Sequence, residues 1–123
     1  MSARLKRNKR LATFVLVTLG VGGCAAPALT PPAPVFARDV RPLFERRCIR
    51  CHGQDEDFQG GLDLRNLCTI RVGGRSGPAV VAGEPEDSLL FQMIVTDEMP
   101  AEGKKLTLRE RDRVRHWIAS GAK

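Results

Sequence analysis

The sequence predicts a small all-α fold of three to four helices, and three observations lead to this expectation. Apolar residues recur at intervals of three and four along several stretches, which is the spacing of one helix face. Stretches rich in glycine and proline separate them, and these residues interrupt helices. The third observation is the segment Cys48-Ile49-Arg50-Cys51-His52, whose spacing is that of covalent haem attachment. In a chain of 123 residues with 5% aromatic residues, a bound porphyrin would supply much of the core.

Each member of this segment has its own chemical role. Cys48 and Cys51 lie on neighbouring parts of one helical turn, so both sulfurs can form thioethers with the two vinyl groups of one porphyrin. His52 follows at once and is the expected proximal ligand of the iron. A zinc site completed by Cys68 and His116, a dithiol redox centre and a chance occurrence remain alternatives.

The first 23 residues have the pattern of a signal peptide. Five of the 20 basic residues and none of the 14 acidic ones precede Leu11, and the apolar run from Leu11 to Val21 is shorter than the roughly 20 residues that span a bilayer. Without this leader the chain has 15 basic and 14 acidic residues, so its net charge is +1. No basic face therefore remains for nucleic acid.

The residues before Cys24 determine the predicted location. Val21-Gly22-Gly23-Cys24 resembles the lipobox of bacterial lipoproteins, in which the cysteine is acylated and becomes the mature N-terminus. We therefore expect a lipid anchor on Cys24 and a place in the cell envelope, on the periplasmic side of a membrane or at the outer membrane. An ordinary cleavage near Ala26 or Ala28, which would leave a soluble periplasmic protein, is the alternative.

Residues 24–37 are predicted to be a linker and residues 38–123 the single domain. The linker contains Pro27, Pro31, Pro32 and Pro34, which favour extended polyproline geometry.

Within the domain, a first helix is expected over Asp39–Cys51, where apolar residues and both cysteines share one face. Polar residues 54–60 form a loop, and a short helical segment follows over Leu62–Ile70. In that segment Cys68 is expected to be buried as a small apolar residue. Residues 71–83 are a glycine-rich loop that we expect to wrap the porphyrin edge.

The C-terminal part of the domain contains two more expected helices. One starts over 84–88, with proline and acids in its first turn, and continues through Leu89–Ile94. The last begins near Thr107, which forms a capping box with Glu110, and stops at Gly121. Its basic residues are expected to form mostly a solvated face.

An electron-transfer haem needs a second axial ligand, and the candidates are Met93, Met99 and His116. Met93 lies within an apolar helical stripe, so core packing is its expected role. Met99 stands in a loop directly before Pro100, which prevents a helix there. Met99 is therefore the predicted distal ligand, and a vacant or weakly bound position is the alternative.

Taken together, these motifs resemble the planctomycete-type cytochrome c domain over Arg38–Ala122. The resemblance rests on an ordered set of segments: VRPLF, CIRCHG, GGLDLR, GRSGPAVVAGEPEDSLL, EMP, and LT through WIASGA. It implies a small class I-like cytochrome fold around one haem c. It also implies attachment at Cys48 and Cys51, a proximal role for His52 and a distal role for Met99. Ala101 stands where the family usually has a second proline.

The expected function is that of a membrane-anchored, monomeric, monohaem c-type cytochrome that passes single electrons between redox partner proteins. No paired carboxylates or nucleophile and base suggest an enzyme. A haem-based catalyst of the peroxidase kind, or a gas or redox sensor with an open distal site, is the alternative.

Overall fold

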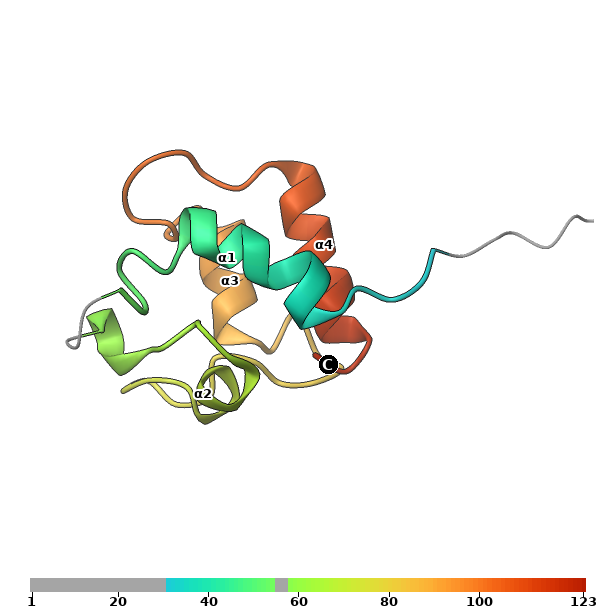
Figure 1. Ribbon diagram of the computed structural model, residues 1–123, viewed down its shortest axis with the longest axis horizontal. Helices are drawn as coiled ribbons and strands as arrows, with labels where there is room; N and C mark the ends of the chain where they lie inside the picture. Colours follow the sequence, from blue (N-terminus) through green and yellow to red (C-terminus); the bar gives the residue numbers. More distant parts are fainter. Residues whose placement is uncertain (1–30, 55–57) are drawn as a thin grey trace, which may run out of the picture. The chain divides into compact units, whose positions relative to one another are not determined.

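The structure, a computed structural model, describes residues 31–54 and 58–123. These residues form helices joined by turns and loops (Figure 1), and no strand occurs in this part of the chain. In chain order the elements are η1 (Phe36–Val40), α1 (Arg41–Arg47), η2 (Gln59–Gly61), α2 (Leu67–Val72), α3 (Leu89–Val95) and α4 (Leu108–Ala119). The predicted all-α class is therefore confirmed.

Several predictions fall on residues that the structure does not describe. The signal peptide over 1–23, lipidation of Cys24 and the first half of the linker, residues 24–30, lie outside the described residues. Among residues 31–54 and 58–123, no helix combines the length and the apolar character required to cross a membrane.

The first helix begins at Phe36 rather than at Asp39. The Asp39 carboxylate accepts a hydrogen bond from the backbone N–H of Val35 at 2.7 Å. Asp39 therefore lies inside η1 and stabilises its first turn. Phe36 is only 5% exposed. A residue that the sequence pattern assigned to the linker is therefore part of the core.

The same helix ends at Arg47 instead of continuing to Cys51. Both Cys48 and Ile49 donate their backbone N–H groups to the carbonyl of Phe44, at 2.8 and 3.0 Å. The regular ladder stops where two donors share one acceptor, and Cys48 has a φ of −129°. The two cysteines consequently lie in the turn that follows the helix.

Three aromatic rings join the two ends of the domain. Trp117 of α4 is fully buried, and its ring centroid lies 5.7 Å from that of Phe36 and 6.2 Å from that of Phe44. The indole N–H donates to the backbone oxygen of Lys123 at 3.1 Å, and the same oxygen accepts the backbone N–H of Phe36 at 2.8 Å. This cluster fixes η1 and α1 against α4.

The last helix starts and stops as predicted. Thr107 Oγ1 accepts from the backbone N–H of Glu110, and Glu110 Oε2 accepts from that of Thr107, at 3.3 and 2.8 Å. These two bonds are the capping box, and the bond from Thr107 N–H holds the pKa of Glu110 below its usual range. The chain leaves the helix through Gly121, which has a φ of +96°.

Residues 84–88 form a turn, and α3 begins only at Leu89. The buried hydroxyl of Ser88 donates to the carbonyl of Glu84 at 2.8 Å and accepts from the N–H of Val81 at 2.9 Å. It is thus used within the turn and does not cap the helix.

The prediction that Cys68 is buried is wrong. On α2 the buried position is Ile70, and two residues of helix turn the side chain by roughly 200°. Cys68 therefore points away from the core and is exposed.

Replacing Trp117 with alanine tests the importance of the aromatic cluster. Trp117→Ala is expected to lower the free energy of unfolding by about 3 to 5 kcal/mol, because it leaves a cavity between helices and removes a hydrogen bond. Leu108→Ala is the control, since Leu108 is 77% exposed on the same helix and should change stability by less than about 0.5 kcal/mol. Denaturant unfolding at neutral pH measures both, and equal losses would contradict the proposed role of the cluster.

Candidate functional site

The segment from Cys48 to His52 is a tight turn. The backbone N–H groups of Cys51 and His52 both donate to the carbonyl of Cys48, at 3.1 and 3.0 Å. This arrangement brings the two thiols and the imidazole to one side of the chain, where all three line a single cavity.

The following loop holds this turn in place. The N–H of Leu64 donates to the carbonyl of His52 at 2.9 Å, and that of Gln59 donates to the carbonyl of Cys51 at 3.0 Å. Gly53 lies where a Cβ atom would be 2.8 Å from Cγ of Arg65. A larger residue there would push Arg65 away from its partner.

That partner is the buried carboxylate of Asp63. The guanidinium of Arg65 donates to it twice, at 3.0 and 2.9 Å, and the backbone N–H of Arg65 adds a third bond at 2.9 Å. The guanidinium also lies over the ring of Phe58, 5.0 Å from its centroid. The side-chain bonds from Arg65 are the main reason that the pKa of Asp63 lies below its usual range.

The cavity has a volume of about 480 Å³, within the range of pockets that hold cofactors. Its walls come from the end of α1, the loop around η2, the glycine-rich loop, α3 and the loop before α4. Apolar groups that include Leu62, Leu64, Ala79, Leu89 and Leu90 form much of its surface. An apolar, concave site of this kind suits a flat, largely apolar ring.

The glycine-rich loop lies along this cavity, as expected. Gly74 and Gly77 line it and form a short antiparallel bridge. A Cβ atom on Gly73 would lie 2.0 Å from the carbonyl oxygen of Gly77, and one on Gly74 would lie 2.5 Å from that of Gly60. Only glycine therefore allows these backbone segments to approach so closely.

Two buried nitrogen atoms on the cavity wall have no hydrogen-bond partner. They are Nδ1 of His52 and Nε of Arg47, and no other buried side-chain nitrogen or oxygen atom in residues 31–54 and 58–123 is left in this state. Buried polar groups without partners are rare. The two thiols, an imidazole, a guanidinium and apolar walls form a cavity whose lining fits a haem, because its iron takes imidazole ligands and its edge carries carboxylates.

The structure weighs against the other interpretations of the cysteine pair. Burial raises the pKa of Cys48 to about 12, whereas a redox-active dithiol needs a lowered thiol pKa. The zinc alternative required Cys68 and His116, and both are exposed. In the described part of the chain, no three histidine, cysteine or acidic side chains lie close enough to hold a metal ion.

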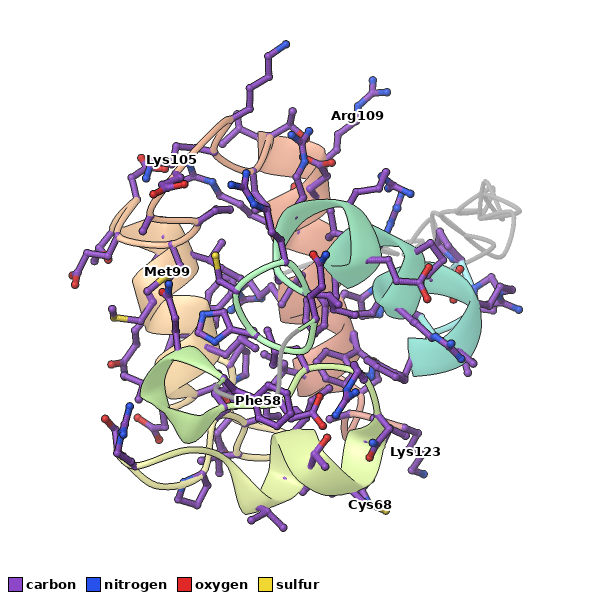
Figure 2. The ribbon with its side chains drawn as sticks, turned by 60° about the vertical axis from the view of Figure 1, so that its left-hand side comes forward. Phe58, Cys68, Met99, Lys105, Arg109 and Lys123 are labelled. Atoms are coloured by element: carbon purple, nitrogen blue, oxygen red, sulfur yellow. The ribbon has the colours of Figure 1, made fainter. Side chains whose placement is uncertain are left out.

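Met99 lies on the wall of the cavity, as its predicted role requires. Figure 2 shows Met99 and Cys68 on opposite sides of the domain. The backbone N–H of Met99 donates to the carbonyl of Met93 at 2.9 Å, which ties the loop to the end of α3. The ammonium group of Lys105 donates a hydrogen bond to the carbonyl of Pro100. The loop is thus held on both sides of Met99.

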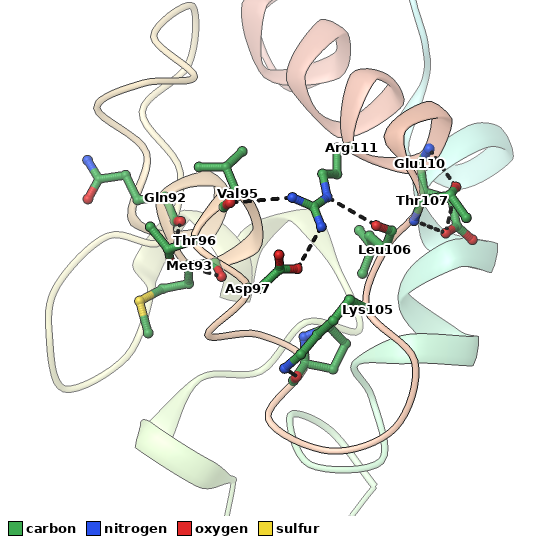
Figure 3. Close-up of polar contacts among 11 residues, drawn as sticks. Gln92, Met93, Val95, Thr96, Asp97, Lys105, Leu106, Thr107, Glu110 and Arg111 are labelled. Atoms are coloured by element: carbon green, nitrogen blue, oxygen red, sulfur yellow. Dashed lines mark hydrogen bonds and ion pairs between the residues drawn. The ribbon is translucent and has the colours of Figure 1, made fainter.

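Arg111 of α4 secures the two ends of the same loop (Figure 3). Its guanidinium donates to the carbonyl of Val95 at 3.3 Å, to the carboxylate of Asp97 at 2.6 Å and to the carbonyl of Leu106 at 3.0 Å. The side chain is only 20% exposed. It does not belong to the solvated basic face that the sequence pattern indicated.

Met93 also differs from the expectation. It is half-buried, lies outside the hydrophobic core cluster and lines the cavity together with Met99. Helical periodicity places Met93 on the inward face of α3 but cannot distinguish a core position from a cavity wall. His116 is exposed and does not line the cavity, so two methionines remain as candidates for the distal position.

The sequence pattern also did not single out Arg47. It precedes the first cysteine, and only the fold shows that its Nε atom is buried on the cavity wall. The sequence signal that could have indicated Arg47 is its position directly before Cys48.

Comparison with known proteins agrees with the resemblance found in the sequence. Residues 48–103 match the family described as planctomycete cytochrome C. No curated protein and no solved structure matches the chain. The match starts at Cys48 and includes Met99.

The Asp63–Arg65 pair generates a pH-dependent prediction. Folding lowers the pKa of Asp63. The ionised carboxylate therefore stabilises the fold fully above its pKa in the unfolded chain, which is about 3.9, and this stabilisation is lost as the pH falls through its pKa in the folded protein. Asp63→Asn is expected to cost about 1 to 2 kcal/mol at pH 7, with a cost that shrinks in acid.

Unfolding measured from neutral to acidic pH tests this expectation. Asp112→Asn is the control, because Asp112 is exposed on α4 and its replacement should change stability by less than about 0.5 kcal/mol. A cost of Asp63→Asn that stays constant down to the lowest pH would show that the charge of Asp63 does not stabilise the fold.

Proposed function

Because residues 48–103 match the planctomycete cytochrome C family, we propose that this protein is a single-haem electron carrier of the cell envelope. Its haem is held by thioethers to Cys48 and Cys51, with His52 as proximal and Met99 as distal ligand. The protein is held at a membrane by a lipid on Cys24 and exchanges single electrons with partner proteins.

One observation carries this proposal. The two thiols, the imidazole and the Met99 loop, which come from separate parts of the chain, line one cavity of about 480 Å³. Haem would supply the capacity to gain and lose one electron. The residues of the cavity would attach it, ligate the iron on two sides and exclude water from the ring.

The held loop supports the choice of an electron carrier over a haem catalyst. A catalyst needs an open position at the metal, whereas Lys105 and Arg111 hold the loop that contains Met99 at the cavity wall by hydrogen bonds to Pro100, Val95, Asp97 and Leu106. A loop held in this way favours a fixed sixth ligand, so that little rearrangement accompanies electron transfer.

The lipid anchor rests on the sequence pattern around Cys24. In this proposal the proline-containing segment after Cys24 spaces the domain from the membrane, and the domain acts as a monomer. Redox proteins in the same compartment would be its partners.

The decisive experiment is the intact mass and reduced absorption spectrum of the full chain, exported in a host with haem-attachment machinery. We expect one haem per chain, the reduced spectrum of a c-type haem and the added mass of a lipid. A Cys48→Ser, Cys51→Ser double variant should lose covalent haem, and Cys68→Ser should retain it. A colourless wild-type protein with two freely reactive neighbouring thiols would contradict the proposal.

The distal ligand can be identified by comparing the two methionines of the cavity. Met99→Ala is expected to free the sixth coordination position of the iron, so that the reduced protein binds carbon monoxide. It is also expected to lower the midpoint potential, because methionine ligation raises that potential. Carbon monoxide titration and a potentiometric titration measure the two effects.

Met93→Ala is the matched control, since it removes the same side chain from the same cavity. It is expected to resist carbon monoxide and to keep the near-infrared band of sulfur-ligated ferric haem. If Met93→Ala binds carbon monoxide and Met99→Ala does not, the distal ligand is Met93. If the wild type already binds carbon monoxide readily, the distal site is open and an enzyme or sensor becomes the better interpretation.

A further inference from the structure

Arg47 is the last residue of α1 and directly precedes the first cysteine of the attachment segment. Its side chain is 27% exposed and lines the cavity. Its Nε atom is buried and has no hydrogen-bond partner among residues 31–54 and 58–123. An unpaired donor on a charged group costs more free energy than one on a neutral group, so a partner is expected.

The nearest acid does not fill this role. The guanidinium Nη2 of Arg47 is 3.6 Å from Oε1 of Glu110, which is too long for a hydrogen bond. The other carboxylate oxygen of Glu110 already accepts from the N–H and the hydroxyl of Thr107, at 2.8 and 3.0 Å. Glu110 therefore attracts the guanidinium electrostatically and leaves its Nε–H group free for another acceptor.

The cavity indicates which acceptor this is. The charged residues around it are mostly basic: Arg46, Arg47, Arg50 and Lys104 line the cavity, and Glu102 is the one acid among the described residues there. Haem carries two carboxylate groups, and a guanidinium binds a carboxylate through two parallel hydrogen bonds. Of the arginine and lysine side chains on the cavity wall, Arg47 alone has a buried donor without a partner in the described part of the chain.

We propose that Arg47 binds a propionate carboxylate of the haem, with Glu110 holding its guanidinium from the other side. This inference rests on the proposed function. Arg47 is then a positioning residue for the cofactor, and its positive charge favours the reduced iron. It also keeps the bound propionate ionised in both oxidation states, because an adjacent cation lowers the pKa of a carboxyl group.

The test is the midpoint potential of the haem-loaded protein as a function of pH. In the wild type we expect little dependence through neutral and mildly acidic pH. Arg47→Gln should lower the potential, since a positive charge is removed. It should also make the potential fall with rising pH, because the released propionate then takes up a proton when the iron takes up an electron.

Arg46→Gln is the matched control. Arg46 is the preceding residue of α1 and also lines the cavity, but it is exposed and has no buried unpaired nitrogen. Its loss should shift the potential less and leave the pH profile unchanged. Equal shifts for Arg46→Gln and Arg47→Gln, with both profiles flat, would overturn the proposal.

A second pair of variants covers the case in which Arg47→Gln does not fold. Arg47→Lys keeps the charge but loses the planar pair of donors, so we expect a smaller shift in the same direction, and Arg46→Lys should behave as the wild type. The proposal would be overturned if Arg47→Lys, Arg46→Lys and the wild type had the same potential and the same pH profile.

Absorbance and intact mass are recorded first. A wild type without haem contradicts the proposed function, whereas haem-loaded variants with identical potentials contradict only the role of Arg47.

Discussion

The packing of Trp117 against Phe36 and Phe44 is the interaction on which the rest of the structure depends. These rings lie on α4, η1 and α1 and are almost wholly shielded from solvent. Because α1 leads directly into Cys48, the position of Phe44 determines where both thiols and His52 enter the cavity. The carbonyl of Phe44 also accepts the two N–H groups that end the helix. One aromatic cluster thus connects the core with the attachment turn.

The part of the cavity wall that contains Met99 depends on α3 and α4. Met99 reaches the cavity from a loop whose backbone is bonded to Met93, while Arg111 and Lys105 hold the segments around it. The His52 side and the Met99 side of the cavity are therefore supported by different contacts, and α4 contributes to both through Trp117 and Arg111. This division shows how a small domain with few aromatic residues brings side chains from separate segments to one cavity.

The sequence predicted those parts of the fold that depend on local rules. The capping box of Thr107 and Glu110 and the stop at Gly121 depend on residues close together in the chain. The helix expected to run through Cys51 instead ends at Arg47, and both cysteines lie in the turn that follows. The roles of Phe36, Cys68, Met93 and Arg111 depend on which distant segment each side chain meets. Helical periodicity could not reveal that Arg111 faces three acceptors from a loop, or that Cys68 falls on the outer face of a short helix. The fold class could be predicted from local patterns, whereas the supporting contacts of the cavity could not.

The carbonyl of Lys123 has a practical consequence for protein engineering. It accepts from both the backbone of Phe36 and the indole of Trp117, and the neighbouring carbonyl of Ala122 accepts from Arg71 at 3.1 Å. These acceptors belong to the main chain, so the side chain of Lys123 can be exchanged freely, but truncation before it would open the aromatic cluster. A purification tag added after Lys123 would preserve the carbonyl, whereas a shortened expression clone would not.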